Sequence, residues 1–146
     1  MKIEIKKTTN FHCEYAITRD NQPAELITLE AKTYLVHDIC HYVVEKNLAY
    51  TNGLWGMLSQ GHTFKDLLGK NNPQTTELRL IEQIVGPVQS VFLKNIPKED
   101  FEIYTKHIGL QITENQLNTC LAEIESIFKS WEQLAVGQRI MLDWNL

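Results

Sequence analysis

Cysteines are few in this chain, and none of them stands in a metal-type or redox-type spacing. The 146 residues include three, Cys13, Cys40 and Cys120, and no Cys-x-x-Cys pair. Thiolate zinc ribbons and thioredoxin-type redox motifs need such pairs and are therefore excluded. An odd number of widely spaced cysteines among apolar neighbours favours reduced, buried thiols in a cytoplasmic protein over a disulfide framework.

Long apolar runs and basic runs are also missing. No stretch of about 18 apolar residues exists, so no membrane-spanning helix is predicted. The start, Met1 to Lys7, is charged with no apolar stretch behind it, which argues against a secretory signal. A net charge of -4 without a lysine-rich helix argues against nucleic-acid binding. We therefore expect a soluble cytoplasmic protein whose partner is a small molecule or a protein, in an oligomeric state that the sequence leaves open.

Several well-known catalytic motifs do not occur in the chain. There is no H-E-x-x-H zinc motif, no P-loop, no G-x-S-x-G elbow and no dinucleotide-binding fingerprint. What is present is an ordinary globular composition, 43% hydrophobic and 22% charged. A chain of 146 residues with this composition fits one domain, spanning residues 1–146, with a sizeable core.

Alternating apolar and polar residues predict strands at both ends of the chain. The first thirty residues read as three strands, and one face of the second is expected to carry Phe11, Cys13, Tyr15 and Ile17. The run from Arg139 to Trp144 alternates in the same way and is expected to pair with the N-terminal strands. The predicted fold class is α+β, a small antiparallel sheet of three N-terminal strands plus the C-terminal strand, packed against several helices.

Helical spacing of apolar residues covers most of the chain between these strands. Residues 75–93 form one such stretch after a break at Asn71–Pro73, and Pro87 within it predicts a kink or a break near Gly86. A short helix after Pro97 is expected to turn Phe101, Tyr104 and Ile108 inward. A capping box, Thr113 to Gln116, opens a long helix to about residue 134.

The segment with the most chemistry is the predicted helix 33–47, with Thr33 as its cap. At about 100° per residue, His37, Asp38, His41 and Glu45 fall within an arc of about 100°, while the rest of the helix is strongly apolar. A helix of this kind is normally surrounded by protein. Buried carboxylates and imidazoles need partners, because an isolated buried charge is costly.

A metal ion is one such partner. His37 and His41 lie one turn apart, the spacing at which two imidazoles bind one divalent cation, with zinc as the first candidate. Asp38 or Glu45 would supply an oxygen ligand, a general base, or the carboxylate that orients an imidazole. In this interpretation the protein is a metal-dependent hydrolase or lyase. A further ligand from outside the helix is sought among His62, His107, Glu77 and Glu82.

An internal hydrogen-bond network is the alternative partner. Helix histidines are often satisfied by neighbouring side chains and water. The protein would then be a non-catalytic binding or interaction domain with a structural polar cluster. A third ligand near the two histidines separates the two hypotheses.

Three blocks of the chain resemble a group of small, uncharacterised bacterial proteins. The blocks are His37-Asp38-x-x-His41-Tyr42-x-Val44-Glu45, then Gly53-Leu54-Trp55-Gly56 with Gly61 beyond it, and Trp131-x-x-Leu134-x-x-Gly137 leading to Leu142-x-Trp144. Together they run from the central helix to the end of the chain. The resemblance supports the choice of these residues and implies no reaction.

The segment His37-Asp38-x-x-His41 alone is similar to the zinc motif of a ubiquinone-biosynthesis accessory protein family. In that family a downstream Glu completes the ligand set. Here nothing acidic lies between Glu45 and Asp66, so Glu45 would have to take that place from within the same helix. The His-Asp pair also resembles metal-dependent phosphohydrolases, whose further ligand helices are not evident in this chain.

Overall fold

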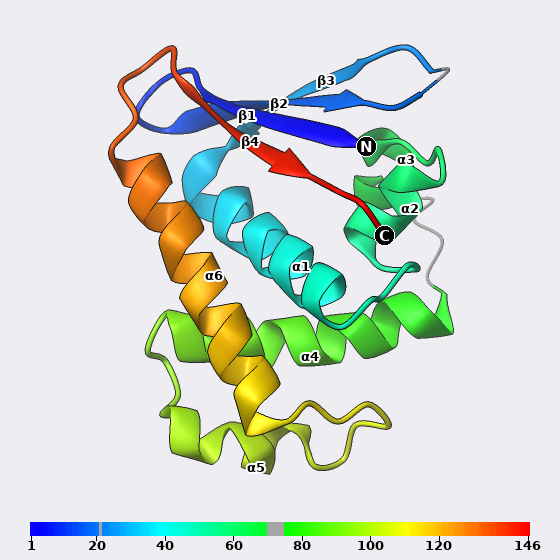
Figure 1. Cartoon of the computed structure of the whole chain (residues 1–146), viewed down its shortest axis with the longest axis vertical. Coiled ribbons are helices and arrows are strands. Elements are labelled where there is room, and N and C mark those ends of the chain that lie inside the picture. Colours follow the sequence, from blue (N-terminus) through cyan, green and yellow to red (C-terminus); the bar gives the residue numbers. More distant parts are fainter. Residues whose placement is uncertain (21, 70–74) are drawn as a thin grey trace.

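The computed structural model describes residues 1–20, 22–69 and 75–146. The segment Asn71–Pro73, expected to separate two helices, lies outside these ranges. Four antiparallel strands form one sheet in the order β3-β2-β1-β4 (Figure 1). They are β1 (Lys2–Lys7), β2 (His12–Thr18), β3 (Glu25–Glu30) and β4 (Arg139–Asp143). The sheet therefore has the composition that the sequence predicts, three N-terminal strands plus the C-terminal one.

Helices fill the chain between β3 and β4. They are the π-helical turn η1 (Ala31–Leu35), α1 (Val36–Asn47), α2 (Leu54–Ser59), α3 (Phe64–Leu68), α4 (Thr76–Phe92), the 3-10 turn η2 (Lys98–Asp100), α5 (Phe101–Thr105) and α6 (Glu114–Glu132). With the antiparallel sheet they confirm the α+β class. None of these described helices has both the length and the apolar character that crossing a membrane requires.

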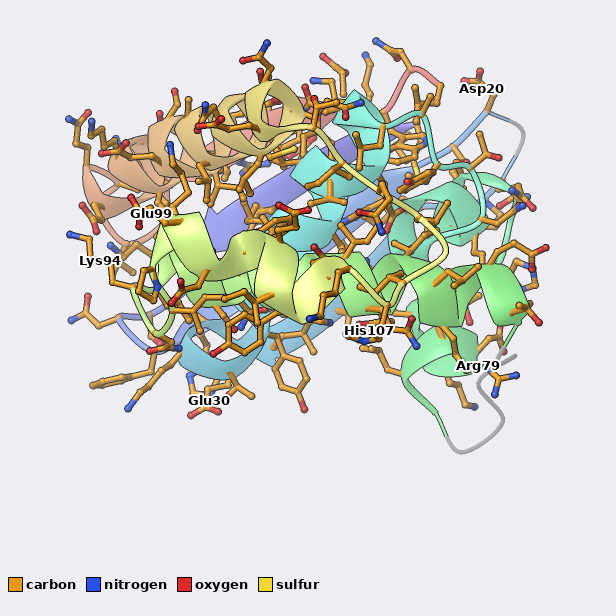
Figure 2. All side chains as sticks on the ribbon, turned by 90° about the horizontal axis from the view of Figure 1, so that it is seen from below. Asp20, Glu30, Arg79, Lys94, Glu99 and His107 are labelled. Atoms are coloured by element: carbon orange, nitrogen blue, oxygen red, sulfur yellow. The ribbon has the colours of Figure 1, made fainter. Side chains whose placement is uncertain are left out.

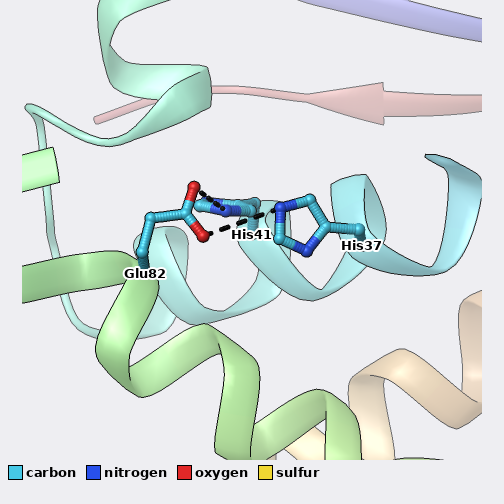
Figure 3. Close-up of side chains that lie close together, drawn as sticks. All are labelled: His37, His41 and Glu82. Carbon is cyan, nitrogen blue, oxygen red and sulfur yellow. Dashed lines mark hydrogen bonds and ion pairs between the residues drawn. The ribbon is translucent and has the colours of Figure 1, made fainter. Parts of the chain in front are cut away.

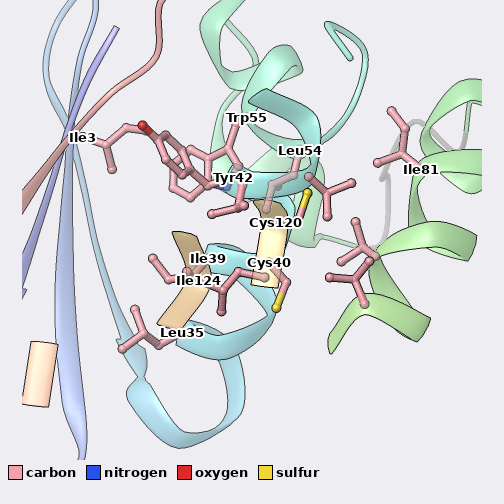
Figure 4. Packing of buried hydrophobic residues seen from close by; sticks show 14 of the residues in the cluster. Ile3, Leu35, Ile39, Cys40, Tyr42, Leu54, Trp55, Ile81, Cys120 and Ile124 are labelled. Carbon is pink, nitrogen blue, oxygen red and sulfur yellow. The ribbon is translucent and has the colours of Figure 1, made fainter. Parts of the chain in front are cut away.

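Helix α1 occupies the centre of the molecule, where it contacts both α4 and α6 (Figure 1). The sheet offers it an apolar face of five fully buried side chains: Ile3, Ile5, Cys13, Tyr15 and Ile17. From α1 itself Ile39 and Cys40 are fully buried in the same core (Figure 4). Val43 of the same helix is fully buried as well. Burial on this scale is the main stabilising contribution, at about 25 cal/mol per Å² of apolar surface removed from water.

Strand β4 joins the two ends of the chain, as its alternation predicts. Leu142 pairs with Ile3 and Ile140 with Ile5, antiparallel to β1. Trp144, one residue beyond the strand, is 3% exposed and lies 6.0 Å from the Tyr42 ring of α1, measured between ring centroids. The C-terminal strand thus closes the sheet and helps to cover α1.

The predicted burial of two residues is wrong. Phe11 is 71% exposed, because β2 begins one residue later and Phe11 belongs to the turn before it. Tyr104 is 48% exposed, whereas Phe101 and Ile108 are buried as predicted. The helix α5 ends at Thr105, so it is too short to hold a regular apolar stripe over the whole segment.

Two expected helix boundaries also differ. Thr33 does not cap α1, because the π-helical turn η1 runs directly into α1 and Thr33 lies inside it, with its hydroxyl donating to Glu30. No break occurs at Gly86, since α4 continues through Pro87 to Phe92. Thr75 caps α4 through Leu78 N, and the capping box at Thr113 and Gln116 opens α6 as predicted.

Candidate metal centre

Three ionisable side chains of α1 are withdrawn from solvent. His41 and Glu45 are fully buried and Asp38 is 2% exposed, whereas the His37 side chain keeps 38% of its surface. The helix holds them because the apolar residues between them pack against the sheet and against α4 and α6 on either side. Their polar atoms must be paired within the protein, since unpaired burial costs several kcal/mol.

His41 is held at both ring nitrogens. Its Nδ1 lies 2.8 Å from Glu45 Oε1, one turn further along α1, and its Nε2 lies 3.1 Å from Glu82 Oε1 of α4 (Figure 3). Glu45 is as buried as His41, but the Glu82 side chain is 45% exposed. The imidazole thus connects an internal carboxylate to one at the surface.

His37 repeats this arrangement one turn earlier. Its Nδ1 lies 3.0 Å from Gln89 Oε1, and its Nε2 lies 3.7 Å from Glu82 Oε2. The two imidazole rings meet edge to face, with their centroids 4.6 Å apart. Each histidine therefore has an oxygen acceptor at Nδ1, and both Nε2 atoms point to the same carboxylate (Figure 3).

His37, His41 and Glu82 form a group that could hold a metal ion. One ligand atom from each of them lies within 4.8 Å of the other two. Zinc at about 2.0 to 2.1 Å from its ligands separates two of them by about 3.3 Å, so small side-chain movements would close the set around an ion. His41 lies at the inner end of this group, and the half-exposed His37 and Glu82 lie at its outer end.

Glu45 is not part of that group, because its carboxylate is occupied from three sides. Besides His41 Nδ1, it accepts the backbone N–H groups of Trp55 and Gly56 at 3.0 and 3.1 Å. The loop before α2 approaches so closely that a Cβ at Gly53 would lie 2.2 Å from the Glu45 carboxyl carbon. A side chain at position 53 would push the Glu45 carboxylate out of its three hydrogen bonds, which explains the glycine two residues before Trp55. Glu45 thus orients His41 and leaves its Nε2 toward Glu82.

Asp38 points away from the two histidines. It lies about 100° around the helix from His37, at the far end of the arc that the sequence predicts. Its Oδ2 accepts the Tyr15 hydroxyl of β2 at 3.0 Å, and its backbone carbonyl accepts the Trp55 indole N–H at 2.8 Å. The structure therefore brings His37 and His41 together with Glu82, and separates Asp38 from them.

The electrostatics differ across the group. Burial lowers the pKa of His41, but the hydrogen bonds and charges of Glu45 and Glu82 outweigh it and raise that pKa to about 9. For Glu82, burial raises the pKa, and the His41 hydrogen bond and charge bring it below the ordinary value. Burial and then the charge of His41 lower the pKa of His37. Burial dominates at Asp38 and raises its pKa to about 6.

Glu82 is one of the four residues outside the helix that the sequence offers as a further ligand, and Gln89 is not among them. The other three do not belong to the group. His107 is exposed (Figure 2), Glu77 is exposed as well, and His62 follows α2 in the chain. A signal for the pair was present, since Glu82 and Gln89 are seven residues apart and so share one side of α4. Nothing in the sequence indicates that this side faces His37 and His41.

Comparisons of the chain with protein-family models, with curated proteins and with solved structures found no match.

Proposed function

We propose that this protein binds a divalent metal ion, with zinc as the first candidate, through His37 Nε2, His41 Nε2 and the Glu82 carboxylate. The observation that supports this most is the placement of the Nδ1 partners. Glu45 Oε1 and Gln89 Oε1 each face one imidazole Nδ1, so a ring that gives up its second proton to a metal presents its lone pair at Nε2, toward Glu82. Metal-ligating histidines in proteins are oriented in this way by acceptors at the other nitrogen.

Two histidines and one glutamate are a ligand set found in catalytic zinc sites, where a fourth position stays open for water or substrate. A bound ion would supply Lewis acidity at the half-exposed side of His37 and Glu82. The reaction classes that we propose for it are those of a metal-dependent hydrolase or lyase. Glu45 and Asp38 are too deeply buried to touch a ligand there. Glu82 would therefore supply the oxygen ligand, and Glu45 acts on His41 as a positioning residue.

One observation favours the alternative of a structural polar cluster in a non-catalytic binding domain. Both nitrogens of His41 and the Nδ1 of His37 already have partners without any ion. An imidazolium at His41 between two carboxylates is a stable arrangement in itself. The proposal therefore needs a direct measurement of metal.

Elemental analysis of protein purified without a histidine tag is that measurement, and it should find a divalent metal near one equivalent. Chelator should lower the melting temperature and added zinc should restore it, because a ligand that binds the native state stabilises it by mass action. The exposed histidine His12 gives a matched control, since His12→Gln should keep the metal and His37→Gln should lose it. Absence of metal together with an unchanged melting temperature would reject the metal centre and leave the structural cluster.

A further inference from the structure

Gly86 lies on the same side of α4 as the two residues that contact the histidines. It comes four residues after Glu82 and three before Gln89, which places the three side by side along the helix. Glu82 contacts both imidazoles and Gln89 contacts His37. The missing side chain at position 86 is therefore next to the half-exposed end of the group.

Contacts with other elements do not require the glycine at this position. A Cβ at Gly53 or Gly56 would lie 2.2 or 2.1 Å from another atom, so the fold requires glycine there. Among the described residues, a Cβ at Gly86 would meet no atom within 4 Å beyond its chain neighbours and the backbone of its own helix. The next residue, Pro87, disfavours the helical conformation for a preceding residue that carries a Cβ, so glycine also eases the passage of α4 through the proline. Toward the neighbouring elements the glycine leaves open space on the side of α4 that carries Glu82 and Gln89.

A metal held by three protein ligands takes its remaining ligand from the solvent side, and zinc accepts oxygen donors there. We propose that Gly86 is the specificity-determining position of the metal centre: it admits a small oxygen-donor ligand, such as a carboxylate or hydroxamate, and the size of residue 86 limits the size of that ligand. This inference rests on the proposed metal binding by His37, His41 and Glu82. It adds the direction from which a ligand approaches and the residue that sets its size.

Cobalt-loaded protein provides the test, because the visible absorption of the ion reports both metal and ligand binding. Acetohydroxamate and the larger benzohydroxamate serve as probes. Gly86→Leu should weaken binding of acetohydroxamate about tenfold or more and of benzohydroxamate further, while the affinity for cobalt changes less than about threefold. Gln83 is exposed on the adjacent, outward side of α4, so Gln83→Leu is the matched control and should bind both probes as the wild type does.

Two further variants keep the test decisive. Gly86→Ala should keep acetohydroxamate binding within about threefold of wild type, since it adds only a methyl group where the neighbouring elements leave open space. The usual gain in melting temperature of a glycine-to-alanine change in a helix is not expected, because a Cβ before Pro87 disfavours the helical conformation. Gly86→Gln carries the same obstruction on a polar side chain, and replaces Gly86→Leu where the apolar variant folds poorly.

The outcomes separate the two proposals. Wild-type protein that binds cobalt but no hydroxamate, or a Gly86→Leu variant that binds both probes as tightly as wild type, overturns the role of Gly86 and leaves the metal centre intact. Wild-type protein that binds no cobalt overturns the metal centre, and the role of Gly86 with it.

Discussion

Asp38 and Glu45 are both buried carboxylates of α1, but they lie on different sides of the helix and meet different hydrogen-bond donors. Glu45 faces the start of α2 and His41, where it accepts three N–H groups. Asp38 faces the sheet, where it accepts the Tyr15 hydroxyl in the apolar surroundings of Tyr15, Trp55 and Phe64. Three N–H donors stabilise a negative charge well, whereas a single neutral hydroxyl compensates less of the cost of burial.

The difference shows how two similar sequence positions acquire different roles. Around Glu45 the structure fixes a carboxylate, the orientation of the His41 ring and thereby the direction of its second nitrogen. Around Asp38 burial dominates and raises the pKa to about 6, so the group tends toward its neutral form. We therefore expect charge to be essential at Glu45 and dispensable at Asp38.

The largest effect is expected from Glu45→Gln. An amide cannot accept three N–H groups in the same geometry, because its own NH₂ group would face either His41 or the backbone N–H of Trp55 and Gly56. Breaking a buried charged pair in this way should lower the free energy of unfolding by about 3 to 4 kcal/mol, as measured by urea denaturation without metal.

Glu123 is the control for that substitution. It is a half-exposed glutamate of α6, paired with Lys46, and Glu123→Gln should change the free energy of unfolding by less than about 1 kcal/mol. A Glu45→Gln variant as stable as Glu123→Gln would show that the charge of Glu45 is not needed, and would remove the contrast with Asp38.

A pH titration should show the charge on His41. Its pKa is raised from 6.5 to about 9 in the folded protein, so the protonated form stabilises the fold. This stabilisation is present in full below pH 6.5 and is lost as the pH rises through 9. In excess chelator, the free energy of unfolding should fall by up to about 3 kcal/mol over that window. The slope should largely disappear in His41→Gln, and an unchanged slope in that variant would assign it to other groups.

Glu82→Gln should separate metal binding from folding. Glu82 is 45% exposed at its side chain, so its contacts with the histidines are partly screened and the metal-free variant should lose about 1 kcal/mol or less. Excess zinc at about 100 times its Kd should stabilise wild type by about 2.7 kcal/mol, and Glu82→Gln much less. Thermal melts with and without zinc measure both. Equal stabilisation of the two proteins would remove Glu82 from the ligand set.

The sequence predicts the sheet and the long helices because their signals are local. Strand alternation around Ile3 and Ile140 and the capping box at Thr113 follow from a few neighbouring residues. The predicted burial of Phe11 and Tyr104 is wrong, because residues at the ends of short strands and helices do not keep the alternation or helical spacing of the central residues. Of the kink or break predicted near Gly86, the break does not occur, since one lost backbone hydrogen bond at Pro87 is tolerated in a helix that packs along α1 and α5.

The candidate site could be predicted only in part for the same reason. His37 and His41 are one turn apart, so their proximity can be read from the helix period. Glu82 and Gln89 reach them from α4, and which side of α4 faces α1 depends on the packing of whole helices. The different surroundings of Asp38 and Glu45 also depend on tertiary contacts. The Tyr15 hydroxyl binds the Asp38 carboxylate, and the loop before α2 packs against the Glu45 carboxylate.

The smallest effect is expected from Asp38→Asn, and it tests the sheet side of the comparison. Asparagine still accepts the Tyr15 hydroxyl but carries no charge, so the cost of burying a carboxylate disappears. The pKa of Asp38 is raised from 3.8 to about 6, which means that the stability it contributes is present below pH 3.8 and is lost as the pH rises through 6. The free energy of unfolding of wild type should therefore fall relative to Asp38→Asn between pH 4 and 6.

At pH 8 the Asp38→Asn variant should be more stable than wild type by about 1 kcal/mol. The rise in the pKa of Asp38 alone corresponds to about 3 kcal/mol, but the amide adds two N–H groups that need partners, and this offsets part of the gain. A variant that is clearly less stable than wild type at pH 8 would show that the charge of Asp38 is needed, and that the two sides of α1 are more alike than their hydrogen bonds indicate.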